Sequence, residues 1–311
     1  MKITDAEVRQ IVDAVADDDS VAWDRLVAIA EEHPELVAPH LLRLIEMKIW
    51  LPAHVFRAMT EDTAGDLVRR IDDGTLPPGL VYRLAAGRTR TAADAFARWT
   101  ATPPAWLATL PEDLAAVGHV GGWELDPAGH RRDLISRTAT ALVPAAEPGS
   151  SVSGGALDTT CGWCGLPMWR LLEASLPSLV PGRFLVATCV RCGCYADLFT
   201  ADGRFLPENG EPGFICDDED GWELPEERLL TLGEARPDPW ATGAGQGWST
   251  LGGLPKWEQD PAYPVCPRCS RTMLYVGQIT GKDREGSWGQ GCHYLFHDPN
   301  CGLSAAVYQQ T

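Results

Sequence analysis

Four cysteines in the second half of the chain have the spacing of a tetrahedral metal site. Cys161, Cys164, Cys189 and Cys192 form two Cys-x-x-Cys pairs separated by 24 residues, and a glycine follows each pair. In such a turn the backbone N–H groups point at the sulfur atoms, and glycine permits the backbone angles that the turn requires. The spacing therefore predicts a structural Zn²⁺ site of the zinc-ribbon type. The alternatives are reduced core cysteines and a thiol redox pair, although a redox motif normally occurs singly and next to a helix.

The same pattern occurs a second time in a less complete form. Residues 164–173 (CGLPMWRLLE) align with residues 269–278 (CSRTMLYVGQ), and residues 192–200 align with residues 301–309. Each copy then contains a cysteine knuckle, a strand, a loop, a returning strand, a second ligand pair and a further strand. The chain is therefore predicted to carry a duplicated metal-binding unit.

Three ligands of a second zinc site follow from this alignment, namely Cys266, Cys269 and Cys301. The fourth position is Asp298 if the copies are aligned without a gap, or His297 if they are shifted by one residue. Imidazole suits Zn²⁺ better than a lone carboxylate among thiolates. We therefore predict His297 as the fourth ligand.

Three cysteines remain outside the two predicted sites. Cys292 is a rival ligand, but it begins a strand predicted at 292–297 and would lie about four to five residues from the knuckle, at ~3.3 Å each. Cys194 alternates with its neighbours in a strand and is expected to be buried, whereas Cys216 precedes an acidic loop. Neither has the nearby histidine and acid that would support a nucleophile.

The first 145 residues are predicted to form an α-helical domain. Thr4 and Glu7 fit a capping box at a helix start, and apolar residues then recur at helical spacing. Successive amphipathic helices joined by short turns favour a HEAT-like stack of helical hairpins, with a compact bundle as the alternative. Shorter helices are expected at 67–71, 80–85 and 92–99.

Beyond this domain, a Pro-, Gly- and Ser-rich segment at 146–157 is predicted to be a linker. Residues 158–311 are predicted to form a β-rich domain with two zinc-knuckle units, 158–202 and 250–311. The predicted fold class is therefore α+β. Short runs of strand-forming residues are found at 168–172, 183–188, 195–199, 273–279, 293–296 and 305–308.

The charge of the chain limits its partners. It has 26 Lys+Arg against 43 Asp+Glu, a net charge of −17, and the acidic residues are spread over both halves. Such a surface repels nucleic acids and anionic membranes unless a local basic patch overrides it. The first residues are polar and no apolar run is long enough to span a membrane, so we expect no signal peptide and a cytoplasmic protein.

Residues 251–279 resemble the YwqG-like (DUF1963) family of bacterial proteins. The shared pattern is a Gly-Gly-x-Pro-x-Trp turn, a Cys-x-x-Cys pair, a Met or Leu, and a strand ending in Gln. The likeness is best over residues 249–310 and extends to the eukaryotic programmed-cell-death-two type ribosome-biogenesis proteins. A cysteine is common in the family where His297 or Asp298 stands here. The matching positions are Gly252, Gly253, Pro255, Trp257, Cys266, Cys269, Met273 and Gln278, followed by Tyr294, Phe296 and Gln309.

This resemblance implies a protein-binding module. The eukaryotic relatives act as chaperones for a ribosomal protein, and some bacterial ones are suspected of being immunity proteins against secreted toxins. We therefore predict a non-enzymatic zinc-binding interaction module, chaperone- or adaptor-like, with an acidic surface for a basic protein partner; neutralisation of a toxin is one alternative. Trp248, Trp257 and Trp288 lie in Gly-rich segments and are candidate partner-binding residues. Core packing is the alternative for Trp257.

Two further functions stay open. A zinc-dependent enzyme would use His293 and His297, which share one face of a strand, but the chain has no His-Glu-x-x-His, Gly-x-Ser-x-Gly or Walker motif. A zinc ribbon could also bind nucleic acid, which the net charge opposes. Retardation of RNA at low salt that disappears at moderate salt would favour this second alternative.

Overall fold

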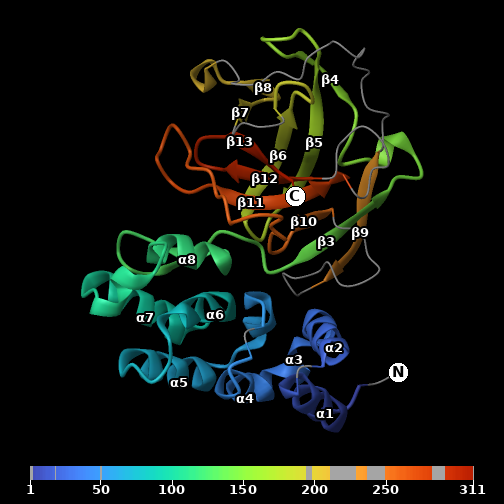
Figure 1. Ribbon diagram of the computed structural model, residues 1–311. Helices are drawn as coiled ribbons and strands as arrows, with labels where there is room; N and C mark the ends of the chain where they lie inside the picture. The colour runs from blue at the N-terminus through green and yellow to red at the C-terminus, as the bar shows by residue number, and fades with distance from the viewer. Residues whose placement is uncertain are drawn as a thin grey trace. The chain divides into compact units, whose positions relative to one another are not determined.

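The computed structural model describes residues 3–17, 19–49, 51–193, 198–210, 229–236, 249–281 and 291–310. The chain divides into two compact units, Met1–Asp133 and Leu134–Thr311 (Figure 1). The first unit is largely helical and the second is built from strands, which confirms the α+β class.

Eight α-helices are described in the first unit, and short 3₁₀ turns connect several of them. The predicted helices at 67–71 and 92–99 are confirmed within α5 and α7, and that at 80–85 is confirmed except that Leu80 ends the 3₁₀ turn before α6. Whether they form a HEAT-like stack stays a prediction. The helices are α1 (Asp5–Ala16), α2 (Ser20–Glu32), α3 (Pro34–Val37), α4 (Leu41–Glu46), α5 (Glu61–Asp72), α6 (Val81–Gly87), α7 (Arg90–Ala101) and α8 (Leu114–Val120).

The start of α1 shows why these segments are helical. The hydroxyl of Thr4 accepts a hydrogen bond from the N–H of Glu7 (3.3 Å), and the Glu7 carboxylate accepts one from the N–H of Thr4 (2.8 Å). This is the predicted capping box, which satisfies two N–H groups that a helix start leaves without partners. The apolar face that follows is buried in the core of the unit.

A short β-hairpin, β1 (Trp123–Leu125) and β2 (Arg131–Asp133), ends the first unit. Trp123 is fully buried, and its indole N–H donates to the carbonyl of Ala85 in α6 (2.9 Å). Its ring packs on Phe96 of α7, with ring centroids 5.0 Å apart. The hairpin therefore closes the helical core through one tryptophan.

The boundary between the units differs from the prediction. It lies between Asp133 and Leu134 and not within 146–157. The segment 146–157 is not a linker, because its backbone is tied into the β-rich unit: the N–H of Val152 donates to the carbonyl of Leu230 (2.8 Å). A run of Pro, Gly and Ser indicates an irregular segment, but it does not distinguish a linker from a loop that is hydrogen-bonded to a sheet.

The second unit contains an eight-stranded sheet, in the order β8-β7-β13-β12-β11-β10-β3-β9, and a three-stranded sheet, in the order β4-β5-β6. All described pairs are antiparallel. The strands are β3 (Ala139–Pro144), β4 (Ala156–Thr160), β5 (Pro167–Leu176), β6 (Val180–Thr188), β7 (Leu198–Ala201), β8 (Arg204–Phe205), β9 (Leu230–Arg236), β10 (Thr250–Gly252), β11 (Leu274–Thr280), β12 (Cys292–Asp298) and β13 (Leu303–Gln309).

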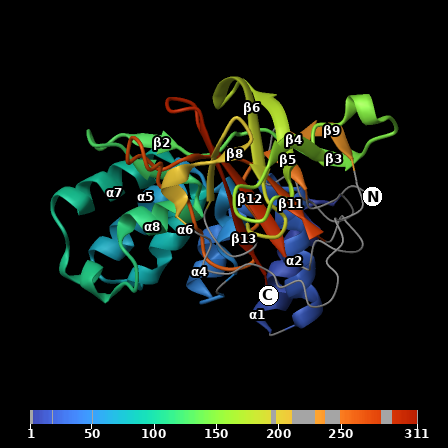
Figure 2. The ribbon, with the colours of Figure 1, turned by 90° about the horizontal axis from the view of Figure 1, so that it is seen from above.

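The two sheets share one hydrophobic core. Strands β5 and β6 run crosswise to β11, β12 and β13 in Figure 1, and β6 packs against β12 and β13; Figure 2 shows the same strands from above. The residues on β11, β12 and β13 are almost all buried, as expected for central strands covered on both faces. Each of the six predicted strand runs overlaps a strand, and the part of 195–199 before residue 198 lies outside the described residues.

Candidate metal centres

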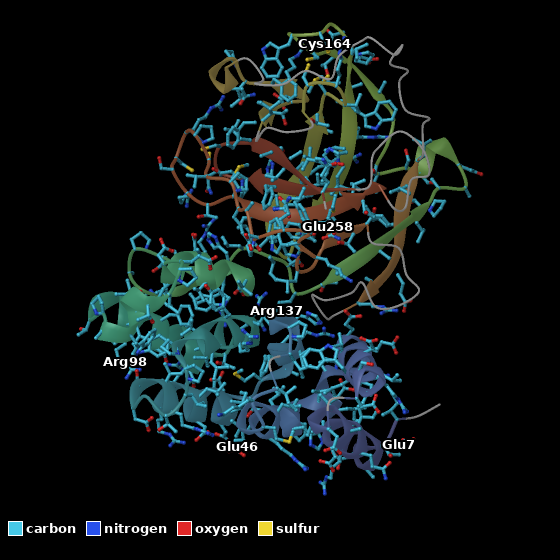
Figure 3. The ribbon with its side chains drawn as sticks, viewed as in Figure 1. Glu7, Glu46, Arg98, Arg137, Cys164 and Glu258 are labelled. Carbon is cyan, nitrogen blue, oxygen red and sulfur yellow. The ribbon has the colours of Figure 1, made fainter. Side chains whose placement is uncertain are left out.

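The first cluster contains the four predicted cysteines. Cys161 and Cys164 lie in the turn between β4 and β5, and Cys189 and Cys192 follow β6. The four sulfur atoms lie within 4.8 Å of one another, and those of Cys164 and Cys189 are 3.4 Å apart. Four sulfurs placed tetrahedrally at 2.3 Å from a Zn²⁺ ion are about 3.8 Å apart. The cluster therefore has the size that a metal ion requires (Figure 3, label Cys164).

The second cluster consists of three cysteines and one carboxylate. Cys266 and Cys269 precede β11, Asp298 is the last residue of β12, and Cys301 precedes β13. Their ligand atoms also lie within 4.8 Å of one another. One carboxylate oxygen of Asp298 accepts a hydrogen bond from the Cys269 thiol (2.9 Å). The other accepts two from Asn300, through its backbone N–H (2.9 Å) and its side-chain amide (3.2 Å). Asn300 therefore orients the carboxylate towards the cysteines, in the way that outer-shell residues orient metal ligands.

The two knuckles have the same backbone hydrogen bonds. In each, the carbonyl of the first cysteine accepts from the residue four positions on: Gly165 to Cys161 (3.0 Å), and Ser270 to Cys266 (2.9 Å). The donor residue has a left-handed backbone in both, with φ of 72° at Gly165 and 56° at Ser270. Glycine adopts this conformation without steric cost, whereas Ser270 carries the steric cost of a Cβ atom in a left-handed backbone.

The returning halves of the two metal-binding copies also match. The N–H of Gly193 donates to the carbonyl of Cys189 (2.8 Å), and the N–H of Gly302 donates to the carbonyl of Asp298 (2.9 Å). The strands correspond in order, with β5, β6 and β7 of the first metal-binding copy matching β11, β12 and β13 of the second copy. This correspondence places Asp298 opposite Cys189 without a gap.

Burial and local hydrogen bonds act in opposite directions on the pKa values of the ligand groups in both clusters. Burial raises the pKa of Cys189 and of Cys266 to about 12, and the N–H groups of the residues two and three positions after each cysteine offset part of this rise. Burial also raises the pKa of Asp298, but hydrogen bonds from Cys266, Cys269 and Asn300 outweigh it and hold the pKa well below its usual range. A coordinated metal ion deprotonates thiols outright, so it would supply the charge that burial otherwise disfavours.

The prediction of His297 as a metal ligand is wrong. Neighbouring residues in a strand point to opposite faces, so when Asp298 faces the knuckle, His297 faces away from it. Its Nδ1 atom lies 3.0 Å from the Ser304 hydroxyl, which itself donates to the carbonyl of Leu185 in β6 (2.7 Å). The imidazole ring stacks on Phe184, with ring centroids 5.5 Å apart, and burial lowers its pKa. His297 therefore connects the two sheets.

Cys292 and His293 join neither cluster. Cys292 begins β12 and pairs with Gln309 in β13, at the opposite end of the strand from Asp298. The His293 ring packs on Tyr308, with ring centroids 4.8 Å apart. Within the described part of the chain, the two histidines of the catalytic alternative are therefore in no group of residues that could hold a metal. Cys194 and Cys216 lie outside the described residues.

One glycine and two glutamines of residues 249–310 fix the backbone next to the second metal cluster. Gly252 has a φ of 70°, and a Cβ atom there would lie 2.6 Å from the carbonyl oxygen of Thr138. Only glycine fits this turn. The side chain of Gln278 accepts from the N–H of Lys256 (2.9 Å), and that of Gln309 accepts from the N–H of Gln259 (3.1 Å). The two glutamines thus hold the loop before the knuckle against the sheet.

Of the three predicted partner-binding tryptophans, only Trp257 lies in the described part of the chain. Its ring packs against Tyr294 at 4.3 Å between centroids, and against Tyr263 at 5.5 Å. This is the core-packing alternative. A role of Trp257 in partner contact has no support from this packing and stays a prediction, and Trp248 and Trp288 lie outside the described residues.

Comparison with known proteins gives one informative similarity. No family model matches the chain, and no solved structure matches it. The chain is similar to the uncharacterized protein YpfL of Salmonella typhimurium. The two are 29% identical over 336 aligned residues, which cover 100% of this chain and 79% of the relative. The similarity therefore extends over both units. No described helix has the length and apolar character that crossing a bilayer requires.

Proposed function

We propose that this protein is a non-enzymatic zinc-binding module that binds a basic protein partner. The observation that carries the proposal is that both clusters are complete, because each brings four protein donors within 4.8 Å of one another. A catalytic zinc site keeps one position open for water or substrate, whereas a structural site is closed by four protein ligands. Two closed sites in one unit favour structural metal.

The donor set favours zinc. Sulfur donors in tetrahedral groups select Zn²⁺ or iron, and hard oxygen-binding ions such as Mg²⁺ are disfavoured. The carboxylate of Asp298 is an acceptable fourth ligand for zinc, which binds Asp and Glu oxygen at about 2.0–2.2 Å. Metal analysis of the purified protein by mass spectrometry distinguishes zinc from iron directly.

Zinc would stabilise the β-rich unit by joining turns that are distant in the sequence. The ligands of each cluster come from two turns that are far apart in the sequence, such as Cys161 and Cys189 in the first cluster. A metal that bridges the two turns closes the end of a strand pair, and its binding free energy adds to the stability of the fold because the unfolded chain has no preformed site. The remaining surface is then free to act as a rigid platform.

The charge of the chain supports a basic partner. A net charge of −17 raises the association rate with a cationic protein and suppresses binding to acidic ones. The resemblance of residues 249–310 to the YwqG-like family, which looks like a family of protein-binding modules, supports the same proposal. A chaperone or adaptor for a basic client is the form of the function that fits both observations.

The test is the purification of native complexes with the full chain, followed by mass spectrometry of bound proteins and metal. The proposal expects two zinc ions per chain and a basic protein that co-purifies and dissociates as the salt concentration rises. A protein without zinc, or one with a single readily exchanged zinc, would contradict the structural-metal part. Co-purification of only acidic proteins, or of none, would contradict the partner part.

A further inference from the structure

A groove of about 1160 Å³ lies in the C-terminal part of the helical unit, between residues 97 and 130. Its walls come from the end of α7, the 3₁₀ turn Ala105–Thr109, the start of α8 and the β1–β2 hairpin. All of these elements belong to the first unit. The groove is therefore a feature of that unit alone and is separate from both metal clusters.

The floor of the groove is mostly apolar. Three leucines and three prolines line it, together with Trp123. Six alanines also line it, and most of them are exposed. Small side chains allow the backbone of a bound segment to come close, as helix interfaces with small residues do. The alanines are Ala97, Ala101, Ala105, Ala108, Ala115 and Ala128.

The rim of the groove is acidic, and local hydrogen bonds fix its carboxylates. Glu112 accepts a hydrogen bond from the Tyr82 hydroxyl (2.6 Å). Asp113 caps α8 by accepting from the N–H of Ala116 (2.8 Å), and Asp126 accepts from two N–H groups of its own turn. Among the described lining residues there are four carboxylates and no Lys or Arg.

Not all of this charge is available to a ligand. The fourth carboxylate, Glu124, forms an ion pair with Arg132 and contributes little. His130 lies near Asp126, 3.8 Å between the nearest nitrogen and oxygen, but it is neutral unless protonated. The potential over the groove is therefore negative, and it comes mainly from Glu112, Asp113 and Asp126.

We infer that this groove docks a basic amphipathic helix of a partner protein. An α-helix about 10 Å across and 5.4 Å per turn occupies roughly 1300 Å³ in three turns, which is close to the volume of the groove. The apolar stripe of such a helix would face the alanines and leucines, and its Lys and Arg would reach the three rim carboxylates. The inference rests on the proposed function and names the surface and the kind of partner.

A small cationic molecule fits the groove less well. Pockets for small ligands typically measure about 300–1000 Å³ and enclose most of the ligand surface. This groove is larger and partly open to solvent. A bound small molecule would leave much of the apolar floor exposed, whereas a helix would cover it.

The probe for the test is a fluorescein-labelled peptide of 14 residues, with leucine at positions i, i+3, i+4 and i+7 and lysine elsewhere. Its control is a peptide of the same composition whose order destroys the apolar face. Fluorescence polarisation with the full zinc-loaded chain should show at least tenfold weaker binding of the control, which is a difference of about 1.4 kcal/mol.

Two matched variants localise the binding. Ala108→Arg puts a long cationic side chain into the groove at an exposed position, and Ala16→Arg makes the same change at the exposed end of α1. Ala108→Arg should weaken binding of the amphipathic peptide at least tenfold, and Ala16→Arg should change the affinity less than about twofold. Glu112→Gln keeps an oxygen acceptor for Tyr82 but removes a charge, so it should weaken binding about two- to fivefold and reduce its salt dependence.

Three results would overturn the inference. The first is equal binding of the two peptides, and the second is unchanged binding to Ala108→Arg, since either means that the peptide is attracted by charge elsewhere. The third is that the peptide binds neither wild type nor Ala108→Arg, whereas a small cationic amphiphile (dodecyltrimethylammonium below its micelle concentration) binds wild type and not Ala108→Arg. A natural partner that stays bound to Ala108→Arg would reject the groove and leave the proposed function intact. Absence of any basic partner from wild type would reject the proposed function itself.

Discussion

Asp298 occupies in the second metal cluster the position that Cys189 occupies in the first. Each is the first residue of the ligand pair at the end of a returning strand, and each accepts a hydrogen bond at its carbonyl from a glycine four positions on, at 2.9 and 2.8 Å. The two clusters are therefore copies of one turn pair that differ in a single ligand. One copy has four thiols and the other has three thiols and a carboxylate.

This equivalence predicts which substitutions remove metal. Asp298→Ala should lower the metal content from two ions to one per chain, because the second cluster loses a donor and the first is untouched. His297→Ala should leave two ions bound, since His297 lies on the opposite face of β12 and contacts Ser304. Metal content is measured by mass spectrometry after gel filtration.

Cys292→Ser is the control for this experiment, because Cys292 is a buried cysteine outside both clusters and should also keep two ions. Loss of metal from His297→Ala with retention in Asp298→Ala would show that the assignment of the fourth ligand is mistaken.

The ligand difference also predicts the order of metal release. Cys269 and Cys301 are half-buried and share their cluster with a carboxylate, whereas three of the four cysteines of the first cluster are buried. The second cluster should therefore lose its ion first to a chelator, and release monitored with a chromophoric chelator should have two phases of equal amplitude. Asp298→Cys restores four thiolates and should slow the fast phase about tenfold or more. A variant that releases both ions as wild type does would contradict this order.

The cysteine spacing was enough to predict most of the two clusters. The knuckles are local turns, so their spacing and flanking residues predict them directly, and alignment of the two copies adds Cys301. The choice between His297 and Asp298 depended on which face of β12 meets the knuckle. Donor chemistry favoured the imidazole, but a shift of one residue reverses every side chain of a strand. Alignment of the two copies without a gap points to Asp298, and it is a better guide to the fourth ligand than donor chemistry.

The parts that escaped prediction depend on contacts between distant segments. The strand β3 lies within the predicted helical domain, yet it pairs with β10 and β9, which are about a hundred residues further along the chain. The β1–β2 hairpin has three residues in each strand, too few for a periodic pattern to show. Its stability comes from Trp123, whose partners lie in α6 and α7. The acidic groove also requires the positions of four separate elements.

Ser304 should be important for the stability of the β-rich unit. Its hydroxyl donates to the carbonyl of Leu185 (2.7 Å) and lies 3.0 Å from Nδ1 of His297, so it joins β13, β6 and β12. Ser304→Ala leaves two buried polar groups without this partner and should lower the free energy of unfolding by about 2–3 kcal/mol. The measurement is urea denaturation of the zinc-loaded protein.

Ser150→Ala is the matched control, because Ser150 is exposed and its hydroxyl donates to the nearby carbonyl of Glu147 (2.8 Å) within the same turn. Its effect should stay within about 0.5 kcal/mol. Equal stability of the two variants would mean that Ser304 does not join the sheets in solution.

Glu61 should make the stability of the helical unit depend on pH. Its carboxylate accepts hydrogen bonds from the N–H groups of Arg90 and Thr91, both 2.9 Å, and so caps the start of α7 from α5. Slight burial raises the pKa of Glu61, but these hydrogen bonds outweigh it, and the pKa lies below its ordinary value of 4.5. The stabilisation is therefore fully present above pH 4.5 and is lost as the pH falls through the lowered pKa.

Glu61→Gln should cost about 1 kcal/mol at pH 7, and the difference from wild type should shrink as the pH falls below 4.5. Circular dichroism at 222 nm during urea denaturation follows the helical unit, because the described α-helices all lie there. Glu35→Gln, an exposed site in α3, should show a difference below about 0.5 kcal/mol that does not vary in this way. A constant difference between wild type and Glu61→Gln from pH 7 to pH 3.5 would argue against the cap.

Gly121 leaves no space for a side chain. A Cβ atom there would lie 2.0 Å from the carbonyl oxygen of Ala85 and 2.6 Å from the indole nitrogen of Trp123, which are themselves joined by a 2.9 Å hydrogen bond. The φ of Gly121 is −87°, which any residue can adopt, so the restriction is steric. Gly121→Ala should separate the hairpin from α6 and destabilise the helical unit by about 3 kcal/mol or more.

Gly65→Ala is the matched control, since nothing lies within 4 Å of a Cβ atom at that position in α5. It should raise the free energy of unfolding by about 0.5–1 kcal/mol, because alanine loses less conformational entropy than glycine in a helix. Both are compared with wild type by thermal melts at 222 nm, and an unchanged melting temperature for Gly121→Ala would mean that the hairpin does not pack on α6 as described.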